Sequence, residues 1–261
     1  MLARLMSKLM IDGEILLDRV EAIIFDKDGT LIDVHHYWSS MIKIRATKIV
    51  DKWFNSSNYE NVRVGLVDVM GVDYETNKLK PNGPVGVKSR SYIVNVVKNY
   101  IKNNGVSVDS DEIELLFKEV DIITAENLSP LIRVLSGTKE LINKMSQLGI
   151  KSVITSTDIT SRAIKAMEVL GLQHHFSEII GGDLVQKTKP APEMVNLALS
   201  KIHCQPENVA VIGDHPVDIE MGLSANVGLN IGVLTGLSDE DLFSDLNCIV
   251  IKDLSSISIG R

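Results

Sequence analysis

The chain contains few cysteines, few aromatic residues and no long apolar run. Cys204 and Cys248 are the only cysteines among 261 residues, and each lies in an apolar stretch with no second ligand at a metal-binding spacing. This scarcity disfavours a disulfide-bonded scaffold and a cysteine-based metal centre. We expect two buried, reduced thiols in a cytoplasmic protein.

Aromatic residues account for 5% of the chain, so its cores must be built mainly from Ile, Leu, Val and Met. No segment approaches the roughly 20 apolar residues needed to cross a bilayer. Residues 1–9 lack the pattern of a secretion signal, which leaves a short helix or a frayed tail. The formal net charge of −7 argues against nucleic-acid binding through general phosphate attraction. We therefore expect neither a membrane nor a nucleic acid as partner, and the oligomeric state stays open.

Short apolar runs alternate with helical patterns through most of the chain. The apolar runs are residues 22–25, 152–156, 178–180, 209–212, 229–234 and 248–251, and the helical patterns include residues 139–148, 162–170 and 193–202. Short apolar runs that end in glycine or acidic residues are typical of buried parallel strands. The alternation predicts an α/β fold with a doubly wound parallel sheet.

Residues 34–133 break this alternation, because they contain helical patterns and no convincing buried strand. Helices are expected over residues 37–54 and 92–101, and a third is expected to open at Asp109, whose spacing from Glu112 matches a capping box. The sequence thus predicts an α-helical cap, or lid, over residues 34–133. It is inserted after the first strand of a core formed by residues 1–33 and 134–261.

Polar side chains with related chemistry follow three of the predicted strands. They are Asp26 and Asp28 after the first strand, Thr155 and Ser156 after the second, and Asp214 and Asp218 after the fourth, with Lys189 in the loop before it. Ligands of parallel α/β sheets bind at the carboxyl ends of the strands, so these groups are expected in one crevice. Carboxylates in one crevice repel unless a cation compensates them, and oxygen ligands favour Mg²⁺. A metal, an ammonium group and a carboxylate nucleophile suit phosphoryl transfer through an aspartyl-phosphate.

Four motifs resemble those of the haloacid dehalogenase superfamily. They are Asp26-Lys27-Asp28-Gly29-Thr30-Leu31, Ile154-Thr155-Ser156, Lys189-Pro190 and Gly213-Asp214-His215-Pro216-Val217-Asp218, in the order and spacing of that superfamily. The stretch Gly181-Gly182-Asp183 before Lys189 resembles phosphoglycolate phosphatase-like members. The resemblance covers residues 20–35 and 136–254. It implies a Mg²⁺-dependent phosphatase that acts on a small phosphorylated metabolite.

The resemblance also implies roles for the carboxylates. Asp26 would attack phosphorus and bind Mg²⁺ through its other carboxylate oxygen. Asp28 would be the general acid and then the general base, and its backbone carbonyl would bind the metal. Asp214 would complete the metal site, with Asp218 as a ligand through water or as an orienting residue.

Two further side chains would act on the phosphoryl group. The resemblance implies that Thr155 donates a hydrogen bond to it, with Ser156 as the alternative donor, and that Lys189 neutralises charge and orients Asp26. The aspartate at position 28 favours phosphatases and phosphomutases, because the halide-displacing relatives lack an acid at this position.

Other functions remain as alternatives. A sugar phosphomutase of the β-phosphoglucomutase type would form the same aspartyl-phosphate and return the phosphoryl group to substrate, so the core residues do not separate it from a phosphatase. A catalytically silent binding module would be expected to lack one of the site residues, and none is missing. An oxidoreductase is disfavoured because no G-x-G-x-x-G follows the first strand.

The cap contains candidates for substrate contacts that the sequence leaves open. His35 and His36 follow the nucleophile loop, and the basic stretch from Lys80 to Arg90 is rich in glycine and proline. That stretch could bind a second anionic group of a substrate. Packing or solvent exposure is the more ordinary explanation for these residues, as turn capping is for Asp183.

Overall fold

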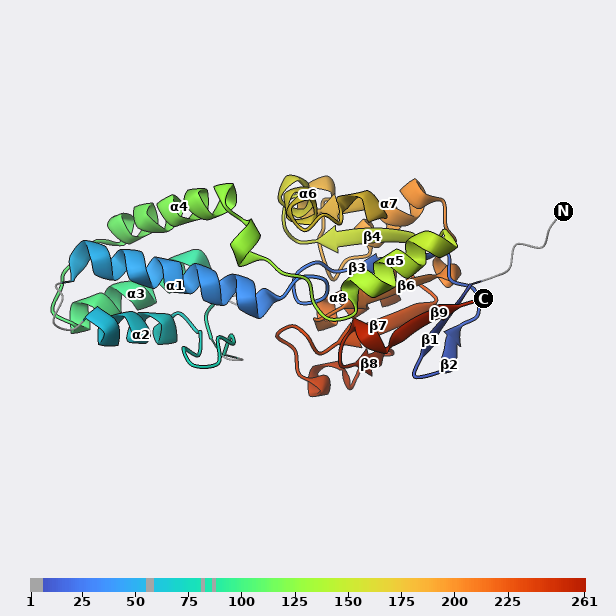
Figure 1. Cartoon of the computed structure of the whole chain (residues 1–261), viewed down its shortest axis with the longest axis horizontal. Coiled ribbons are helices and arrows are strands. Elements are labelled where there is room, and N and C mark those ends of the chain that lie inside the picture. Colours follow the sequence, from blue (N-terminus) through green and yellow to red (C-terminus); the bar gives the residue numbers. More distant parts are fainter. Residues whose placement is uncertain (1–6, 55–58, 81–82, 86–87) are drawn as a thin grey trace. The chain divides into compact units, whose positions relative to one another are not determined.

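The computed structural model describes residues 7–54, 59–80, 83–85 and 88–261. The chain divides into two compact units, each with its own internal packing (Figure 1). The first, called the core unit below, comprises Met1–Asp33 and Val134–Arg261. The second, called the helical unit, comprises Val34–Arg133.

A six-stranded parallel sheet forms the centre of the core unit. Its strands lie in the order β5 (Phe176–Gly181), β4 (Lys151–Ser156), β3 (Ala22–Phe25), β6 (Val209–Gly213), β7 (Leu229–Val233) and β8 (Ile249–Ile251). Every neighbouring pair is parallel, and all six strands coincide with the apolar runs of the sequence. The predicted doubly wound α/β fold is confirmed.

The strand order reverses at β3. From β3 the chain passes to β4 and β5 on one side, and then to β6, β7 and β8 on the other. Such a reversal leaves a crevice at the carboxyl end of the central strand, where the loops on either side lead in opposite directions. Asp26 directly follows β3 and therefore lies where the strand order reverses.

Helices cover both faces of the sheet. The α-helices in the described part of the core unit are α5 (Thr138–Leu148), α6 (Thr160–Val169), α7 (Glu193–Ile202) and α8 (Pro216–Ser224). Met194 of α7 packs in one buried cluster with Ile24 and Val153. Ser152 precedes Val153 and so points to the other face, where its hydroxyl contacts Met145 Sδ of α5 at 3.6 Å. The strands are thus buried on both sides, as their continuous apolar sequences require.

A second, three-stranded antiparallel sheet was not predicted. Its order is β2 (Glu14–Leu17), β1 (Lys8–Ile11) and β9 (Ile257–Gly260), and it joins a segment near the start of the chain to one near its end. The expectation of a helix or tail over residues 1–9 is wrong for Lys8 and Leu9, which belong to β1. Leu9 and Ile11 are buried whereas Lys8 and Met10 are half-buried, which is the alternation of a one-sided strand.

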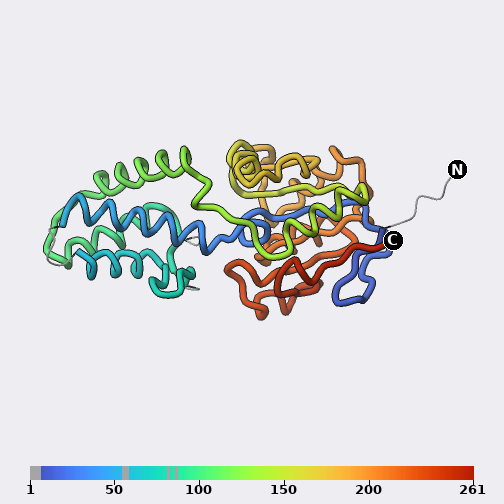
Figure 2. Tube along the Cα trace, in the orientation of Figure 1, coloured from blue at the N-terminus to red at the C-terminus, as the bar shows by residue number. Residues whose placement is uncertain are grey.

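The helical unit contains four α-helices, traced in Figure 2, among its described residues. They are α1 (Val34–Trp53), α2 (Tyr59–Val69), α3 (Arg90–Asn103) and α4 (Ser110–Glu126). At the start of α4, the backbone N–H of Asp109 donates to Glu112 Oε2 at 3.1 Å, as the predicted capping box requires. The helical unit follows β3 in the chain, and its described residues contain no named strand.

Helix α2 was not predicted, because Gly65 and several valines weaken its helical signal. A β-carbon at Gly65 would lie 1.9 Å from Tyr100 Oη of α3, so the glycine allows close packing of α2 against α3. No helix within the described ranges is both long and apolar enough to span a membrane. The two cysteines are free thiols; Cys204 is buried as expected, whereas Cys248 is only half-buried.

Candidate active site

The loop after β3 carries the first group of candidate residues. The backbone N–H of Asp26 donates to Ile212 O at 2.8 Å and fixes the start of the loop against β6. Gly29 then turns the chain with a φ of +89°, a conformation that favours glycine. A β-carbon there would also lie 2.4 Å from Asp214 Oδ2. The glycine of the first motif thus provides both the turn and the space for a carboxylate from β6.

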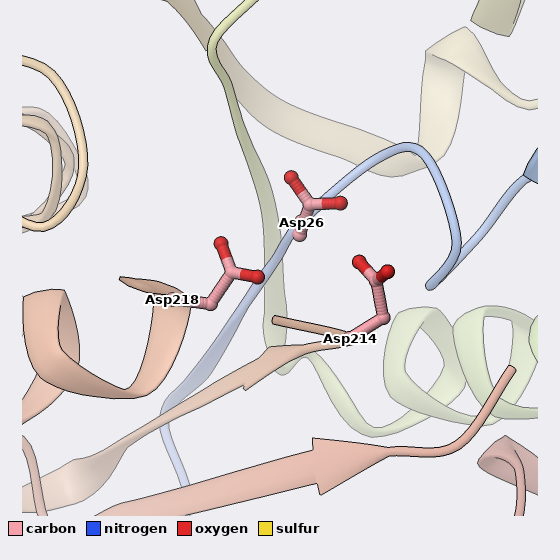
Figure 3. A group of neighbouring side chains, drawn as sticks. All are labelled: Asp26, Asp214 and Asp218. Carbon is pink, nitrogen blue, oxygen red and sulfur yellow. The ribbon is translucent and has the colours of Figure 1, made fainter. Parts of the chain in front are cut away.

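Three carboxylates converge at this edge of the sheet (Figure 3). Asp26 follows β3, Asp214 follows β6, and Asp218 lies in the first turn of α8. One oxygen from each lies within 4.8 Å of the others. The predicted juxtaposition of these three side chains is therefore present in the structure.

Lys189 connects two of the three carboxylates. Its Nζ lies 2.5 Å from Asp26 Oδ1 and 2.6 Å from Asp218 Oδ1, and only 2% of its side chain is exposed. The second oxygen of Asp218, Oδ2, accepts a hydrogen bond from the backbone N–H of His215 at 3.1 Å. Both oxygens of Asp218 are thus engaged by the protein, whereas Asp214 accepts a longer hydrogen bond, at 3.4 Å, from the Leu237 N–H.

The electrostatics of the cluster call for an additional cation. Burial, only partly offset by Lys189 and reinforced by the Asp218 and Asp28 carboxylates, raises the pKa of Asp26 from 3.8 to about 6. Burial and the charges of Asp26 and Asp218 raise the pKa of Asp214 well above its usual value. One ammonium group does not balance three carboxylates, of which Asp214 and Asp218 are buried and Asp26 is half-buried. A hard divalent cation with oxygen ligands, such as Mg²⁺, fits this donor set.

Lys189 itself remains charged in this environment. Burial alone would lower the pKa of its ammonium group, but the neighbouring Asp218 and Asp26 carboxylates outweigh burial, so the pKa is raised. Lys189 can therefore act as a fixed positive charge beside Asp26.

The two hydroxyls at the end of β4 differ in their hydrogen bonds. Ser156 Oγ accepts from the Asp158 N–H at 3.2 Å and so supports its own loop. Thr155 Oγ1 is fully buried and, within the described part of the chain, makes no hydrogen bond. A buried hydroxyl without a partner costs stability, which marks Thr155 as the better candidate to contact a bound group.

The side chain of Asp28 lies outside the carboxylate cluster. Its Oδ2 is 2.5 Å from Nζ of Lys27, and the side chain is partly exposed. The sequence prediction gives Asp28 a metal contact through its backbone carbonyl, which leaves the side chain for acid–base chemistry. The observed position is compatible with this division of roles.

A loop after β7 also contributes to the site, and it was not predicted from the sequence. Thr235 Oγ1 donates to the carbonyl of Gly29 at 2.5 Å, and the Leu237 N–H reaches Asp214. Between them, Gly236 allows the backbone to pass directly over the Asp214 carboxylate. Thr235-Gly236 at the end of an apolar run resembles the other strand ends, so its position was the available signal.

The other candidates are engaged elsewhere. His35 Nδ1 accepts from the Leu79 N–H at 3.1 Å, and His36 Nε2 lies 3.1 Å from Pro130 O, both within the helical unit. Lys80 pairs with Asp68, and Arg90 pairs with Asp121 and Glu114. Pro81 and Asn82 of the same basic stretch lie outside the described residues.

Asp183 caps a helix, in line with its turn-capping interpretation. Its Oδ1 accepts hydrogen bonds from both the N–H and the Oγ1 of Thr160, each at 2.7 Å, at the start of α6. This bond ties the loop before Lys189 to the loop after β4, so Asp183 supports the site without entering it.

The fold and the site define a hydrolase of the parallel α/β class with a carboxylate-rich centre at the end of its middle strand. Residues 20–226 match the haloacid dehalogenase-like hydrolase family, and the chain belongs to that family. The predicted superfamily, and with it the prediction of an enzyme, is confirmed.

The chain is similar to a curated protein named a pyrophosphatase and to two solved structures. It is 28% identical to pyrophosphatase PpaX of Oceanobacillus iheyensis over 240 residues, which cover 91% of this chain and 95% of the relative. A structure described as a predicted phosphoglycolate phosphatase from Haemophilus somnus has a TM-score of 0.62 and 20% identity, and covers 90% of this chain and 95% of its own. A structure assigned as a β-phosphoglucomutase from Thermotoga maritima has a TM-score of 0.64, 19% identity and the same coverage. The likeness to these two structures supports the α/β fold of this chain.

Proposed function

We propose that the protein is a Mg²⁺-dependent phosphatase that hydrolyses a small phosphate monoester through an aspartyl-phosphate on Asp26. The observation that carries this proposal is the buried Lys189 ammonium held between Asp26 and Asp218, next to Asp214. A structural ion pair needs one carboxylate, whereas a third carboxylate beside a buried pair adds repulsion. An anionic substrate together with a divalent cation accounts for both the lysine and the extra carboxylate.

Asp26 supplies the nucleophile in the first half of the reaction. One of its oxygens, Oδ1, is held by Lys189, which fixes the orientation of the carboxylate and keeps a positive charge beside the phosphoryl oxygens. The other oxygen, Oδ2, attacks phosphorus, and the bond from phosphorus to the leaving oxygen breaks. The product of this step is an aspartyl-phosphate.

Asp28 moves the protons of both halves. In the first it donates a proton to the leaving alkoxide, and in the second it accepts one from the water that attacks the acyl phosphate. The hydrolysis returns Asp26 as a carboxylate and releases inorganic phosphate. The partial exposure of Asp28 suits a group that must exchange protons with substrate and water.

Thr155 and a bound cation complete the proposed site. The buried Thr155 hydroxyl, unpaired within the described residues, would donate a hydrogen bond to the phosphoryl group. Mg²⁺ would be held by Asp26, Asp214 and the backbone carbonyl of Asp28, and when bound it neutralises phosphoryl charge. Asp218 would act as an orienting residue or through water, because its own oxygens already contact Lys189 and His215.

The helical unit is proposed to act as a lid that selects the substrate. It enters the chain eight residues after the nucleophile, between Asp33 and Val134, and closure of an inserted unit can exclude water and restrict access to small molecules. The partner we propose is therefore a small phosphorylated metabolite. Phosphoglycolate, sugar phosphates and inorganic pyrophosphate are the first compounds to test, the last because a relative is named a pyrophosphatase.

The test is a phosphate-release screen over these compounds and an aryl phosphate, with and without Mg²⁺, for the wild-type chain and Asp26→Asn. We expect Mg²⁺-dependent release by the wild type and none by the variant. If the wild type releases phosphate from no compound, the proposal is wrong. If a sugar phosphate is isomerised without release of phosphate, the function is that of a phosphomutase.

A further inference from the structure

Lys27 lies between the two aspartates of the nucleophile loop, and its side chain is buried. Only 7% of it is exposed, whereas a lysine in a surface turn ordinarily keeps its ammonium group in water. Nζ lies 2.5 Å from Asp28 Oδ2 and 4.0 Å from Asp158 Oδ2. The lysine thus connects the nucleophile loop to the loop after β4.

The burial of this ammonium group needs compensation. The Asp28 carboxylate at 2.5 Å supplies most of this compensation, and the Asp158 carboxylate at 4.0 Å adds to it. Lys27 is therefore charged and carries its charge in a fixed place. A fixed charge next to a partly exposed carboxylate restricts the orientations of that carboxylate.

Asp158 is itself held in position. Its Oδ1 accepts from the Ile159 N–H at 2.8 Å at the start of α6, and its own N–H donates to Ser156 Oγ at 3.2 Å. Its other oxygen, Oδ2, faces Lys27. A continuous series of contacts therefore runs from the start of α6 through Asp158 and Lys27 to Asp28.

We propose that Lys27 is a positioning residue for the acid–base step: its ammonium group holds Oδ2 of Asp28, anchored by Asp158, so that Oδ1 faces the leaving oxygen. This inference rests on the proposed phosphatase function. It assigns a role to the residue between the two aspartates, whose observed ion pairs are with Asp28 and Asp158. The proton that reaches the leaving oxygen comes from Asp28, and Lys27 keeps its own.

Comparing substrates with different leaving groups distinguishes a positioning role of Lys27 from a purely structural one. An aryl phosphate such as p-nitrophenyl phosphate departs as a stable phenolate and needs little protonation, whereas an alkyl phosphate needs a well-placed acid. The value of kcat/KM reports the steps up to departure of the leaving group. For Lys27→Met we expect kcat/KM to fall by about 10–100-fold with the best alkyl phosphate of the screen and by less than about threefold with the aryl phosphate, within the range that acid–base catalysis supplies.

Two further variants complete the experiment. Lys165→Met is the matched control, because Lys165 is an exposed lysine of the same unit that pairs with Glu168, and we expect no change with either ester. Asp158→Asn should show the same selectivity for the alkyl ester as Lys27→Met, but with a smaller loss. If Lys27→Met does not fold, Asp158→Asn decides the question.

The experiment distinguishes a failure of the role proposed for Lys27 from a failure of the proposed phosphatase function. Equal losses with both esters, or no loss with either, in an active enzyme would overturn the role of Lys27 and leave the phosphatase assignment intact. If the wild-type chain hydrolyses neither ester, the proposed function fails and the role of Lys27 fails with it. A selective loss with the alkyl ester supports both.

Discussion

A β-carbon at Gly236 would lie 1.7 Å from Oδ2 of Asp214, so the backbone of the loop after β7 and this carboxylate are in direct contact. Asp214 is the carboxylate of the cluster that receives the weakest protein hydrogen bond, at 3.4 Å from the Leu237 N–H. The close approach of Gly236 therefore limits where this carboxylate can lie.

Gly236→Ala should weaken Mg²⁺ binding, because the added methyl group must displace the Asp214 carboxylate. We expect the Mg²⁺ concentration for half-maximal activity to rise by about 10–100-fold, as for other changes next to metal ligands. Gly105→Ala is a control for backbone strain alone, because Gly105 has a φ of +86° and a β-carbon there meets nothing within 4 Å; it should lower stability and leave the Mg²⁺ requirement unchanged. An unchanged Mg²⁺ requirement in Gly236→Ala would show that Asp214 is not a metal ligand.

Asp26→Asn should abolish turnover without destabilising the metal-free protein. An amide cannot form the aspartyl-phosphate, so we expect a loss of at least about 10³-fold in kcat, as for removal of other covalent nucleophiles. Because the variant also removes one of three repelling carboxylates, its melting temperature without Mg²⁺ should be equal to or above that of the wild type. A variant that keeps more than a tenth of wild-type activity would contradict the nucleophile assignment.

Thr155→Val should separate activity from stability. It removes a hydroxyl that is buried and, among the described residues, unpaired, so the free energy of unfolding should stay the same or increase. If that hydroxyl binds the phosphoryl group, kcat/KM should fall by about 10–100-fold, the equivalent of about 1.5–3 kcal/mol for a hydrogen bond to a charged group. Ser156→Ala, which removes a hydroxyl that supports its own loop, is the comparison; a larger loss there would transfer the role to Ser156.

The metal-free protein should become less stable as the pH rises from about 4 to about 6. The folded chain keeps the proton of Asp26 up to about pH 6, whereas the unfolded chain releases it near 3.8. Between these values the folded state binds more protons, so the free energy of unfolding falls with rising pH. Denaturant titrations of the metal-free chain at pH 4.5 and 6.5 measure this, and Asp26→Asn should reduce the difference.

Mg²⁺ should stabilise the protein more at pH 7.5 than at pH 5. At pH 5 a carboxyl group with a pKa of about 6 is mostly protonated, so the ion must displace a proton and its apparent affinity should be at least about tenfold lower. Melting temperatures over a Mg²⁺ titration at both pH values test this. Equal stabilisation at the two values would mean that Asp26 does not bind the ion.

The sequence predicted the parts of the fold whose signals are local. The strands of the parallel sheet are buried on both faces, and each therefore appears as a continuous apolar run that ends in a polar loop. Strand β1 escaped prediction because only three apolar residues follow Lys8 in it, and because its partner β9 lies almost at the other end of the chain. Its pairing is set by a contact between distant residues, which a local pattern does not contain.

The candidate site was likewise predicted where its signals are local and missed where they depend on contacts between distant residues. Asp26 and Asp214 were predicted because each follows an apolar run in a recognisable motif, and the structure brings them together with Asp218 and Lys189. The environment of Lys27 was not predictable, since it depends on Asp158, which is brought near by the pairing of β3 with β4. Likewise, no local feature of Gly236 indicates that a carboxylate from another strand lies against it.

The two points where the inserted residues leave and rejoin the core unit are paired with each other. Ile32 and Val134 form an antiparallel bridge, and the Leu135 N–H donates to Leu31 O at 3.0 Å. The core unit is thus closed on itself at the base of the insertion, and each residue of the carboxylate cluster lies within it. Residues 34–133 can accordingly diverge, lengthen or be exchanged for another insert during evolution while the chemical centre is inherited unchanged.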